Sequence, residues 1–324
     1  MNTTLTAQGP EDLLAAVPVV LGFRPEHSLV MLTFDARRTF HARVDLPPPA
    51  QVDGALPELR EILLSPCLSH GVGRVAFVVY GDDAVVAAAV AAELVPAFES
   101  AGVGVLTVLR AHEGRWWRVP AHPGERPAGP TPYDDETHPF AAQAVFVGRV
   151  THPSREALRE TLAPLPEHRR RMERLTAALP ESQAADLDRV LEIVGHCVDE
   201  CADPDDDEAA LVLQAVTRVD IRDAAVQAVT RDNAVGHLRL WSHLLRLAPD
   251  PQVPDVAAVA AFCAWQAGDG ALAWCALDRC FAQDDDHGLG TCLAACLTRA
   301  VPPSAWEEVV DDEMEEPQPT RESA

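Results

Sequence analysis

The chain has no lysine, and all 26 of its basic residues are arginine. Without lysine there can be no Schiff-base nucleophile, no serine–lysine dyad and no phosphate-loop lysine. The sequence also contains no G-x-x-x-x-G-K-[ST] and no G-x-S-x-G segment. P-loop nucleotidases and conventional α/β-hydrolases are therefore disfavoured before any fold is considered.

Long apolar runs are missing as well. No stretch approaches the ~18 apolar residues of a membrane span, and Pro18 and Gly22 interrupt the apolar stretch near the N-terminus. No basic segment precedes that stretch, so it does not resemble a signal peptide. We expect a soluble, cytoplasmic protein with no membrane partner.

The eight cysteines include no C-x-x-C pair. Two pairs place thiols four residues apart on expected helices, a spacing that can hold a metal: Cys197, which follows His196, with Cys201, and Cys292 with Cys296. The alternative is core packing, because a reduced cysteine among valine, leucine and alanine behaves as a small apolar residue. We favour core packing and expect no metal and no cofactor.

Basic charge is scarce relative to acidic charge. The chain has 50 acidic residues and a formal net charge of −24, so its surface repels phosphate backbones. The short basic run Arg169-Arg170-Arg171 lies between Glu167 and Glu173, which favours a salt-bridged helix face. We expect no nucleic-acid partner, and instead a protein partner or a small-molecule ligand.

The length of 324 residues and the hydrophobic content of 48% predict roughly two domains. Strands and helices alternate over residues 1–150, which predicts an α/β domain with a mixed sheet. From Ser154 onward the pattern is helical with short connections, which predicts an all-α domain of helical hairpins over residues 151–306. The acidic tail, residues 307–324, is expected to be disordered.

The α/β domain is expected to open with a short helix from Asp12, which Pro18 and Gly22 end. Helices between successive strands favour parallel neighbouring strands. Residues 120–139, with six prolines, predict a loop or linker, and residues 141–150 fit either a strand or a helix. The other predicted elements are the strands Leu29–Leu32, Phe40–Leu46, Arg74–Tyr80, Val103–Leu109 and the edge strand Arg115–Val119, and the helices Val52–Leu64 and Ala84–Ser100.

The segment DLLAAVPVVLGFRPEHSLVML, which begins at Asp12, followed by ARVDLP, resembles the N-terminal signature of an actinobacterial family of uncharacterised proteins, DUF4192. The resemblance covers nearly the whole chain and implies lineage and layout, with no activity attached. Cysteines that the family carries after Arg-Trp-Trp are missing from Val119–Tyr133, so no metal or redox role is implied. The resemblance continues at Arg115-Trp116-Trp117, Phe146-Val147-Gly148-Arg149, Ile221-Arg222-Asp223, Trp265 and Gly268–Ala273.

The stretch Val256–Asp285 resembles one tetratricopeptide repeat. Small residues, the Gly268-Asp269 turn and Leu277 stand where that repeat needs them, although the proline expected at its end is Asp285 here. No clean 34-residue period appears elsewhere, and such arrays need several units. The pattern indicates a tetratricopeptide-like helix pair without establishing a repeat protein.

The best candidate site lies in the loop before the first strand. If the sheet is ordered as expected, polar groups from this loop, the second strand and the turn after the third strand converge at one edge, where ligands of open α/β sheets bind. His27 and Glu26 are the candidate catalytic acid and base. Arg24 or Arg43 is expected to bind a carboxylate or phosphate group of the ligand. The alternative is that Arg43 and Asp45 lie on the solvated face of a strand, and that Glu26 and His27 form hydrogen bonds within their own loop. The candidate ligand-binding residues are Arg24, Arg43, Asp45 and Asp82.

Arg115-Trp116-Trp117 is unusual in a chain with only 5% aromatic residues. Adjacent strand residues face opposite ways, so one tryptophan is expected to be buried and the other exposed. An exposed tryptophan beside an arginine can stack a ring or cover a partner surface. Arg115 and Trp116 are therefore added to the candidate ligand-binding residues, with core packing of both tryptophans as the alternative.

These patterns predict a non-catalytic binding or scaffold protein built from an α/β module and a helical array. The alternative is a lysine-free, metal-free enzyme that performs acid–base chemistry on a small anionic substrate at the Arg24–His27 loop. A deep pocket that contains His27 and a buried carboxylate favours the enzyme. A shallow loop whose polar groups face water favours the scaffold.

Overall fold

A computed structural model describes residues 6–37, 39–122, 124–146, 148–180 and 186–306. The chain divides into two compact units, Met1–Leu158 and Arg159–Ala324, whereas the sequence pattern placed the boundary after residue 150. The acidic tail 307–324, expected to be disordered, lies outside the described residues.

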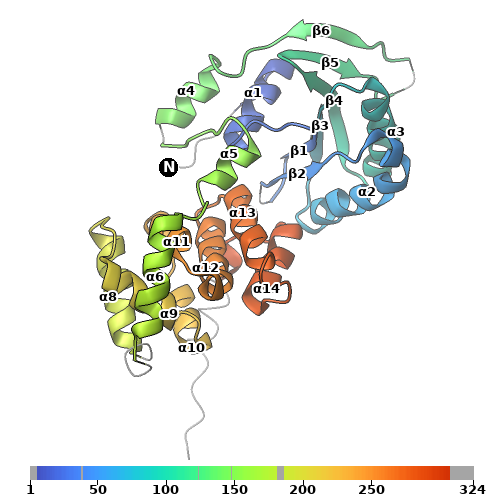
Figure 1. Cartoon of the computed structure of the whole chain (residues 1–324). Helices are drawn as coiled ribbons and strands as arrows, with labels where there is room; N and C mark the ends of the chain where they lie inside the picture. The colour runs from blue at the N-terminus through green and yellow to red at the C-terminus, as the bar shows by residue number, and fades with distance from the viewer. Residues whose placement is uncertain (1–5, 38, 123, 147, 181–185, 307–324) are drawn as a thin grey trace, which may run out of the picture. The chain divides into compact units, whose positions relative to one another are not determined.

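The first unit is built on a mixed sheet, which is six-stranded within the described residues and has the order β2-β1-β3-β4-β5-β6 (Figure 1). The expected α/β class with a mixed sheet is confirmed, since the only parallel pair among the described strands is β3 with β4. The strands are β1 (Ser28–Phe34), β2 (His41–Asp45), β3 (Arg74–Tyr80), β4 (Gly104–His112), β5 (Arg115–Val119) and β6 (Ala128–Pro132).

The helix between β2 and β3 does not join neighbouring strands, contrary to the sequence expectation. This helix, α2 (Val52–Ser69), follows the 3-10 turn η1 (Pro49–Gln51) and crosses β1. β2 and β3 are each antiparallel to β1 and are therefore parallel to one another, with β1 between them. The expectation is correct for α3 (Ala84–Ser100), which joins the parallel neighbours β3 and β4.

Helices cover both faces of the central strands. On one face Leu29 of β1 and Phe77 of β3 join a core cluster with residues of α2 and α3. On the other face Val30 and Val78 pack with α1 (Pro10–Leu21), and Figure 1 shows α1 opposite α2 and α3. Burial on both faces explains why β1 is apolar without alternation.

The first helix is longer than the sequence predicted. Pro18 and Gly22 were both expected to end it; the prediction is correct for Gly22 and wrong for Pro18, which lies inside α1. The helix ends at Gly22, which has a left-handed φ of 77° and donates its N–H to the carbonyl oxygen of Pro18 at 2.9 Å. This left-handed C-terminal cap, and not the proline, stops the helix.

The proline-rich segment 120–139 contains a strand, which corrects the expected loop. Residues 128–132 form β6, so β6 is the edge strand and β5, expected at the edge, lies inside the sheet. An edge strand accepts proline, because only one of its sides must supply N–H groups to a neighbour. The ambiguous segment after this region begins with a helix, α4 (Pro139–Phe146).

The second unit is helical throughout the part of the chain that the structure describes, which confirms the expected class. In that same part, no helix combines the length and apolarity needed to cross a membrane. After α5 (Arg155–Glu160), the elements are α6 (Pro166–Ala178), α8 (Leu187–Asp199), α9 (Asp206–Ala215), α10 (Val219–Gln227), α11 (Ala234–Leu247), η2 (Asp250–Gln252), α12 (Val253–Gln266), α13 (Gly270–Phe281) and α14 (Gly288–Thr298).

The helix α12 lies at the centre of the second unit. Every residue from Val256 to Gln266 is buried, which fits a helix that is apolar on all sides. It packs against α10, α11, α13 and α14. The turn to α13 is closed by Asp269, whose Oδ1 accepts a hydrogen bond from the N–H of Leu272 at 2.9 Å.

We expect Gly129→Ala to destabilise the first unit far more than Gly124→Ala. Both glycines have a positive φ, of 111° and 90°, so either alanine costs about 1 kcal/mol of backbone strain. A Cβ at Gly129 would also lie 2.6 Å from the carbonyl oxygen of Trp116, whereas one at Gly124 meets nothing within 4 Å. The overpacking should bring the loss for Gly129→Ala to about 3 kcal/mol. Equal urea-unfolding free energies for the two variants would contradict the placement of β6.

Candidate functional site

A pocket of about 260 Å³ lies where β3 ends and α3 begins, and we call it the strand-end pocket. The register of the sheet explains its position, because Ser28 at the start of β1 is opposite both Asp45 at the end of β2 and Tyr80 at the end of β3. Three connections therefore meet at this edge. The pocket is lined by His27, Leu46, Pro47, Pro48, Pro49, Val79, Gly81, Asp82, Asp83 and Val86.

One wall of the strand-end pocket is the turn Gly81–Asp83. Asp83 caps α3, since its Oδ1 accepts hydrogen bonds from the N–H groups of Val85 at 2.7 Å and Val86 at 3.3 Å. Arg110 of β4 fixes the same turn by donating from Nη1 to the carbonyl oxygen of Asp82 at 2.7 Å. The turn is thus held from both sides, by a helix cap and by a guanidinium group.

Arg110 is a buried cation that is held without a salt bridge to any described residue. Its guanidinium group stacks on the ring of Trp117 at 3.7 Å from the ring centroid, a cation–π geometry. Burial lowers the pKa of Arg110, and the nearby Asp82 and Asp83 carboxylates partly offset that effect. No local pattern predicts this arrangement, because the arginine that stacks on Trp117 comes from β4 and is not the neighbouring Arg115.

The opposite wall of the strand-end pocket comes from the loop before β1 and the connector after β2. The N–H of Leu46 donates to the carbonyl oxygen of His27 at 2.9 Å, which ties the two segments together. His27 has a positive φ of 44°, an uncommon conformation for a residue other than glycine. Its ring and the side chain of the preceding residue, Glu26, are exposed.

Arg43 and Asp45 do not face the strand-end pocket. Arg43 lies opposite Val30, which packs on the α1 side of the sheet, whereas Val79 packs on the α2 and α3 side. The Arg43 Nε donates to Ser28 Oγ at 2.8 Å, and its Nη2 forms an ion pair with Asp45 at 2.6 Å. The structure therefore brings His27 and Asp82 together and places Arg43 and Asp45 across the sheet.

Arg24 is paired with carboxylates that the sequence reasoning missed. Its Nε lies 3.0 Å from Asp135 Oδ2, and its Nη2 lies 3.4 Å from Glu136 Oε1. Burial is the main cause that raises the pKa of nearby Tyr133 to about 12, and the Asp135 carboxylate adds to it. The acidic run after Tyr133 was a visible signal, but nothing in the sequence assigned it to Arg24.

Trp116 and Arg115 have separate surroundings. Trp116 is 7% exposed and packs in the core on the α1 side, where its Nε1 donates to Glu11 Oε1 at 3.3 Å. Arg115 is exposed at the start of β5. Trp117 is half-buried under Arg110, so the stacked tryptophan is the second of the pair.

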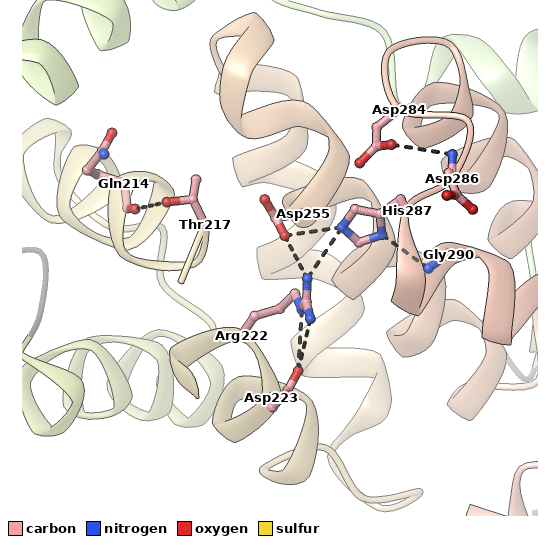
Figure 2. A network of polar contacts seen from close by, with 9 residues as sticks. All are labelled: Gln214, Thr217, Arg222, Asp223, Asp255, Asp284, Asp286, His287 and Gly290. Atoms are coloured by element: carbon pink, nitrogen blue, oxygen red, sulfur yellow. Dashed lines mark hydrogen bonds and ion pairs between the residues drawn. The ribbon is translucent and has the colours of Figure 1, made fainter. Parts of the chain in front are cut away.

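A second polar cluster lies in the helical unit and joins three helices (Figure 2). Asp255, in the first turn of α12, accepts hydrogen bonds at Oδ1 from Arg222 Nη1 at 2.9 Å and from His287 Nε2 at 3.1 Å. Arg222 comes from α10, and its Nε and Nη2 also donate to Asp223 Oδ1, each at 3.3 Å. We call Arg222, Asp255 and His287 the three-helix cluster.

The histidine of the three-helix cluster has both ring nitrogens occupied. His287, 6% exposed, accepts the N–H of Gly290 at Nδ1 at 3.1 Å and so caps α14. His138 in the first unit repeats this pattern, since its Nδ1 accepts the N–H of Phe140 and its Nε2 contacts Asp12 at 3.1 Å. To exchange a proton with a substrate, either ring would first have to give up one of these contacts.

The charge of Asp255 is stabilised by its partners. Burial raises the pKa of this carboxyl, but the hydrogen bonds and charges of His287 and Arg222 outweigh that effect and lower the pKa below its ordinary value. No cluster of three or more metal-ligating side chains that could hold an ion occurs among the described residues. The eight cysteines are free thiols, and burial raises the pKa of Cys67 and, together with nearby carboxylates, that of Cys280 to about 12.

A family model described as a domain of unknown function, DUF4192, matches residues 10–304. The chain belongs to this family. Neither a curated protein nor a solved structure gives a significant match. In this DUF4192 chain, the segments that carry the resemblance supply His27 of the strand-end pocket, Trp117 under Arg110, and Arg222 of the three-helix cluster.

We expect Asp255→Asn to lower the stability of the helical unit at neutral pH by about 2 kcal/mol, because it removes a charged acceptor of two hydrogen bonds. The matched control is Asp223→Asn, since Asp223 also accepts from Arg222 but is half-exposed. That control should cost less than about 1 kcal/mol. Urea unfolding followed by tryptophan fluorescence measures both, and Trp241 and Trp265 report on this unit.

The sign of the pH dependence follows from the lowered pKa of Asp255. The unfolded state binds this proton more tightly, so the contribution of Asp255 is complete above about pH 4, the ordinary value. It is lost as the pH falls through the lower folded-state pKa. The stability difference between the natural chain and Asp255→Asn should therefore shrink below about pH 4. A difference that grows with acidification would contradict the assignment.

Proposed function

We propose that this DUF4192 chain is a non-catalytic binding protein whose α/β unit holds a small ligand, or one side chain of a partner, in the strand-end pocket. The observation that carries the proposal is an open pocket whose walls are mostly apolar and in whose lining the side chains of His27 and Asp82 have no hydrogen-bond partner among the described residues. Leu46, Val79 and Val86 line it together with three prolines. Apolar walls with a few convergent polar groups are typical of ligand pockets.

The neutralised arginines favour binding over the enzymatic alternative. An enzyme that acts on a small anion needs a free cation at its site, but Arg24 is paired with Asp135 and Glu136, and Arg43 with Asp45. The exposed side chain of Glu26 is not part of the pocket lining. His27 lacks a buried carboxylate beside it, since Asp82 is exposed.

The helical unit supplies the scaffold in this proposal. The pair α12 and α13, in the stretch that resembles a tetratricopeptide repeat, packs closely around the Gly268-Asp269 turn. Stacked helix pairs commonly present extended binding surfaces. The eight free thiols support a reducing, cytoplasmic setting, and the net charge of −24 supports a protein or small-molecule partner over nucleic acid.

A variant whose new side chain fills the strand-end pocket tests the proposal. We expect a neutral probe, 1-pentanol, to give a saturation-transfer NMR signal with the natural chain and to lose it with Gly81→Leu. A Cβ at Gly81 meets only Leu46 Cδ1 at an ordinary 3.6 Å, so the leucine can enter the pocket without a backbone clash. Gly54→Leu is the matched control, because a Cβ at Gly54 on the exposed side of α2 meets nothing within 4 Å.

A further variant tests whether Glu26 takes part in binding. Glu26→Gln should leave the 1-pentanol signal within about twofold of the natural chain, since Glu26 is exposed and outside the pocket lining. Loss of the signal in Gly54→Leu as well as in Gly81→Leu would mean that the probe binds elsewhere. No signal with the natural chain would refute the strand-end pocket as a binding site.

A further inference from the structure

We propose that the strand-end pocket takes a primary alkylammonium group, that is, a short apolar chain that ends in a protonated amine. This inference rests on the proposed function and adds the ligand's chemistry to it. The apolar walls hold the chain of the ligand, and the turn Gly81–Asp83 receives its charge.

The size and lining of the strand-end pocket suit one short chain. Its volume of about 260 Å³ lies just below the roughly 300–1,000 Å³ of sites that enclose drug-sized ligands. Val79 and Val86 are buried residues that contribute to its lining, and Pro47, Pro48 and Pro49 add rigid apolar rings. A ligand with a long polar body would leave its own hydrogen-bonding groups unsatisfied against these walls.

The charge in the lining of the strand-end pocket is negative. The Asp82 side chain is exposed and has no hydrogen-bond or ion-pair partner among the residues that the structure describes. The Oδ1 atom of Asp83 already accepts the hydrogen bonds that cap α3. Arg110 offsets part of this charge, but its guanidinium group is directed to backbone carbonyls and to the Trp117 ring. The unsatisfied group is therefore a carboxylate, which attracts a cation.

The same geometry disfavours an anionic ligand. The N–H groups of Val85 and Val86 in the first turn of α3, which would otherwise attract an anion, are already bonded to Asp83. Arg43 lies on the opposite face of the sheet and is paired with Asp45. A carboxylate ligand in the pocket would meet Asp82 with no available cation to compensate it.

The alkylammonium group cannot come from the side chain of a second copy, because the chain has no lysine. Two sources share the required chemistry, namely a free aliphatic amine and a lysine side chain of a protein partner. A lysine side chain has a four-carbon stem and a compact charge, which matches the apolar walls and the acidic turn. The experiment must therefore include both forms.

Three probes of equal chain length and different charge test the inference: 1-pentylamine, 1-pentanol and pentanoate. Titrations followed by NMR should rank the affinities of the full chain as amine, then alcohol, then acid. Asp82→Asn keeps the backbone carbonyl that Arg110 binds and removes the charge. It should weaken pentylamine binding by about threefold, the contribution of a partly exposed ion pair, and leave pentanol binding unchanged. Glu61→Gln, an exposed site on α2 outside the pocket lining, is the control with the same loss of charge.

The outcomes separate the inference from the proposed function. Equal binding of all three probes, abolished by Gly81→Leu, would keep the pocket as a binding site and overturn the preference for an amine. Preferred binding of pentanoate would overturn it as well. A larger effect of Glu61→Gln than of Asp82→Asn would show that the amine responds to the general negative charge and not to this turn.

A comparison of two peptides then identifies the source of the amine. An N-acetylated, C-amidated Gly-Lys-Gly peptide is compared with the same peptide carrying norleucine in place of lysine. Binding of the lysine peptide that weakens with Asp82→Asn supports a protein partner, whereas binding of pentylamine alone supports a free amine. Failure of both pentylamine and the lysine peptide to bind would refute the inference.

Discussion

Burial of the central strands on both faces is the constraint on which the α/β unit depends. Residues 29–32 of β1 and 75–80 of β3 are buried almost without exception, because α1 covers one face and α2 and α3 cover the other. Such strands have no room for polar chemistry along their length. Polar groups can gather only where strands end, and the strand-end pocket lies at that position, between three connections and the start of α3.

Each unit also has an arginine whose guanidinium group is held by backbone carbonyls. Arg110 is buried and Arg279 is half-buried. Each is held by backbone carbonyls: Arg110 by those of Gly81 and Asp82, and Arg279 by those of Leu162 and Leu245. Burial, with the charge of Arg169, lowers the pKa of Arg279 to about 10. In each of these arginines the Nη1 group donates to both carbonyl oxygens. These two arginines fix turns and segments and are not free to bind a ligand.

Local patterns predicted those elements that depend on local chemistry. The bounds of Arg74–Tyr80 and Ala84–Ser100 agree with the structure residue for residue, because β-branched runs, glycines and an Asp83 cap are all encoded nearby. β6 escaped prediction, since its five residues show no alternation and its pairing comes from β5. Proximity of His27 to the Asp82 turn was predicted on condition of the strand order, and the antiparallel pairing of β1 with β3 supplies it. The pairing of Arg24 with Asp135 spans 111 residues, and no local signal reports it.

The two polar clusters of this chain differ in whether their groups have hydrogen-bond partners, and that difference is the reason for proposing the strand-end pocket as the binding site. In the three-helix cluster both ring nitrogens of His287 have partners, and Asp255 accepts two donors, so the cluster's hydrogen bonds are spent on joining α10, α12 and α14. A ligand there would have to replace these bonds and recover their free energy before it gained any affinity. In the strand-end pocket the backbone is fixed by Arg110 and by the cap of α3, while the Asp82 carboxylate stays available. A rigid frame with an unsatisfied charge is the combination that binding requires, because the frame is already ordered and the charge still lacks its partner.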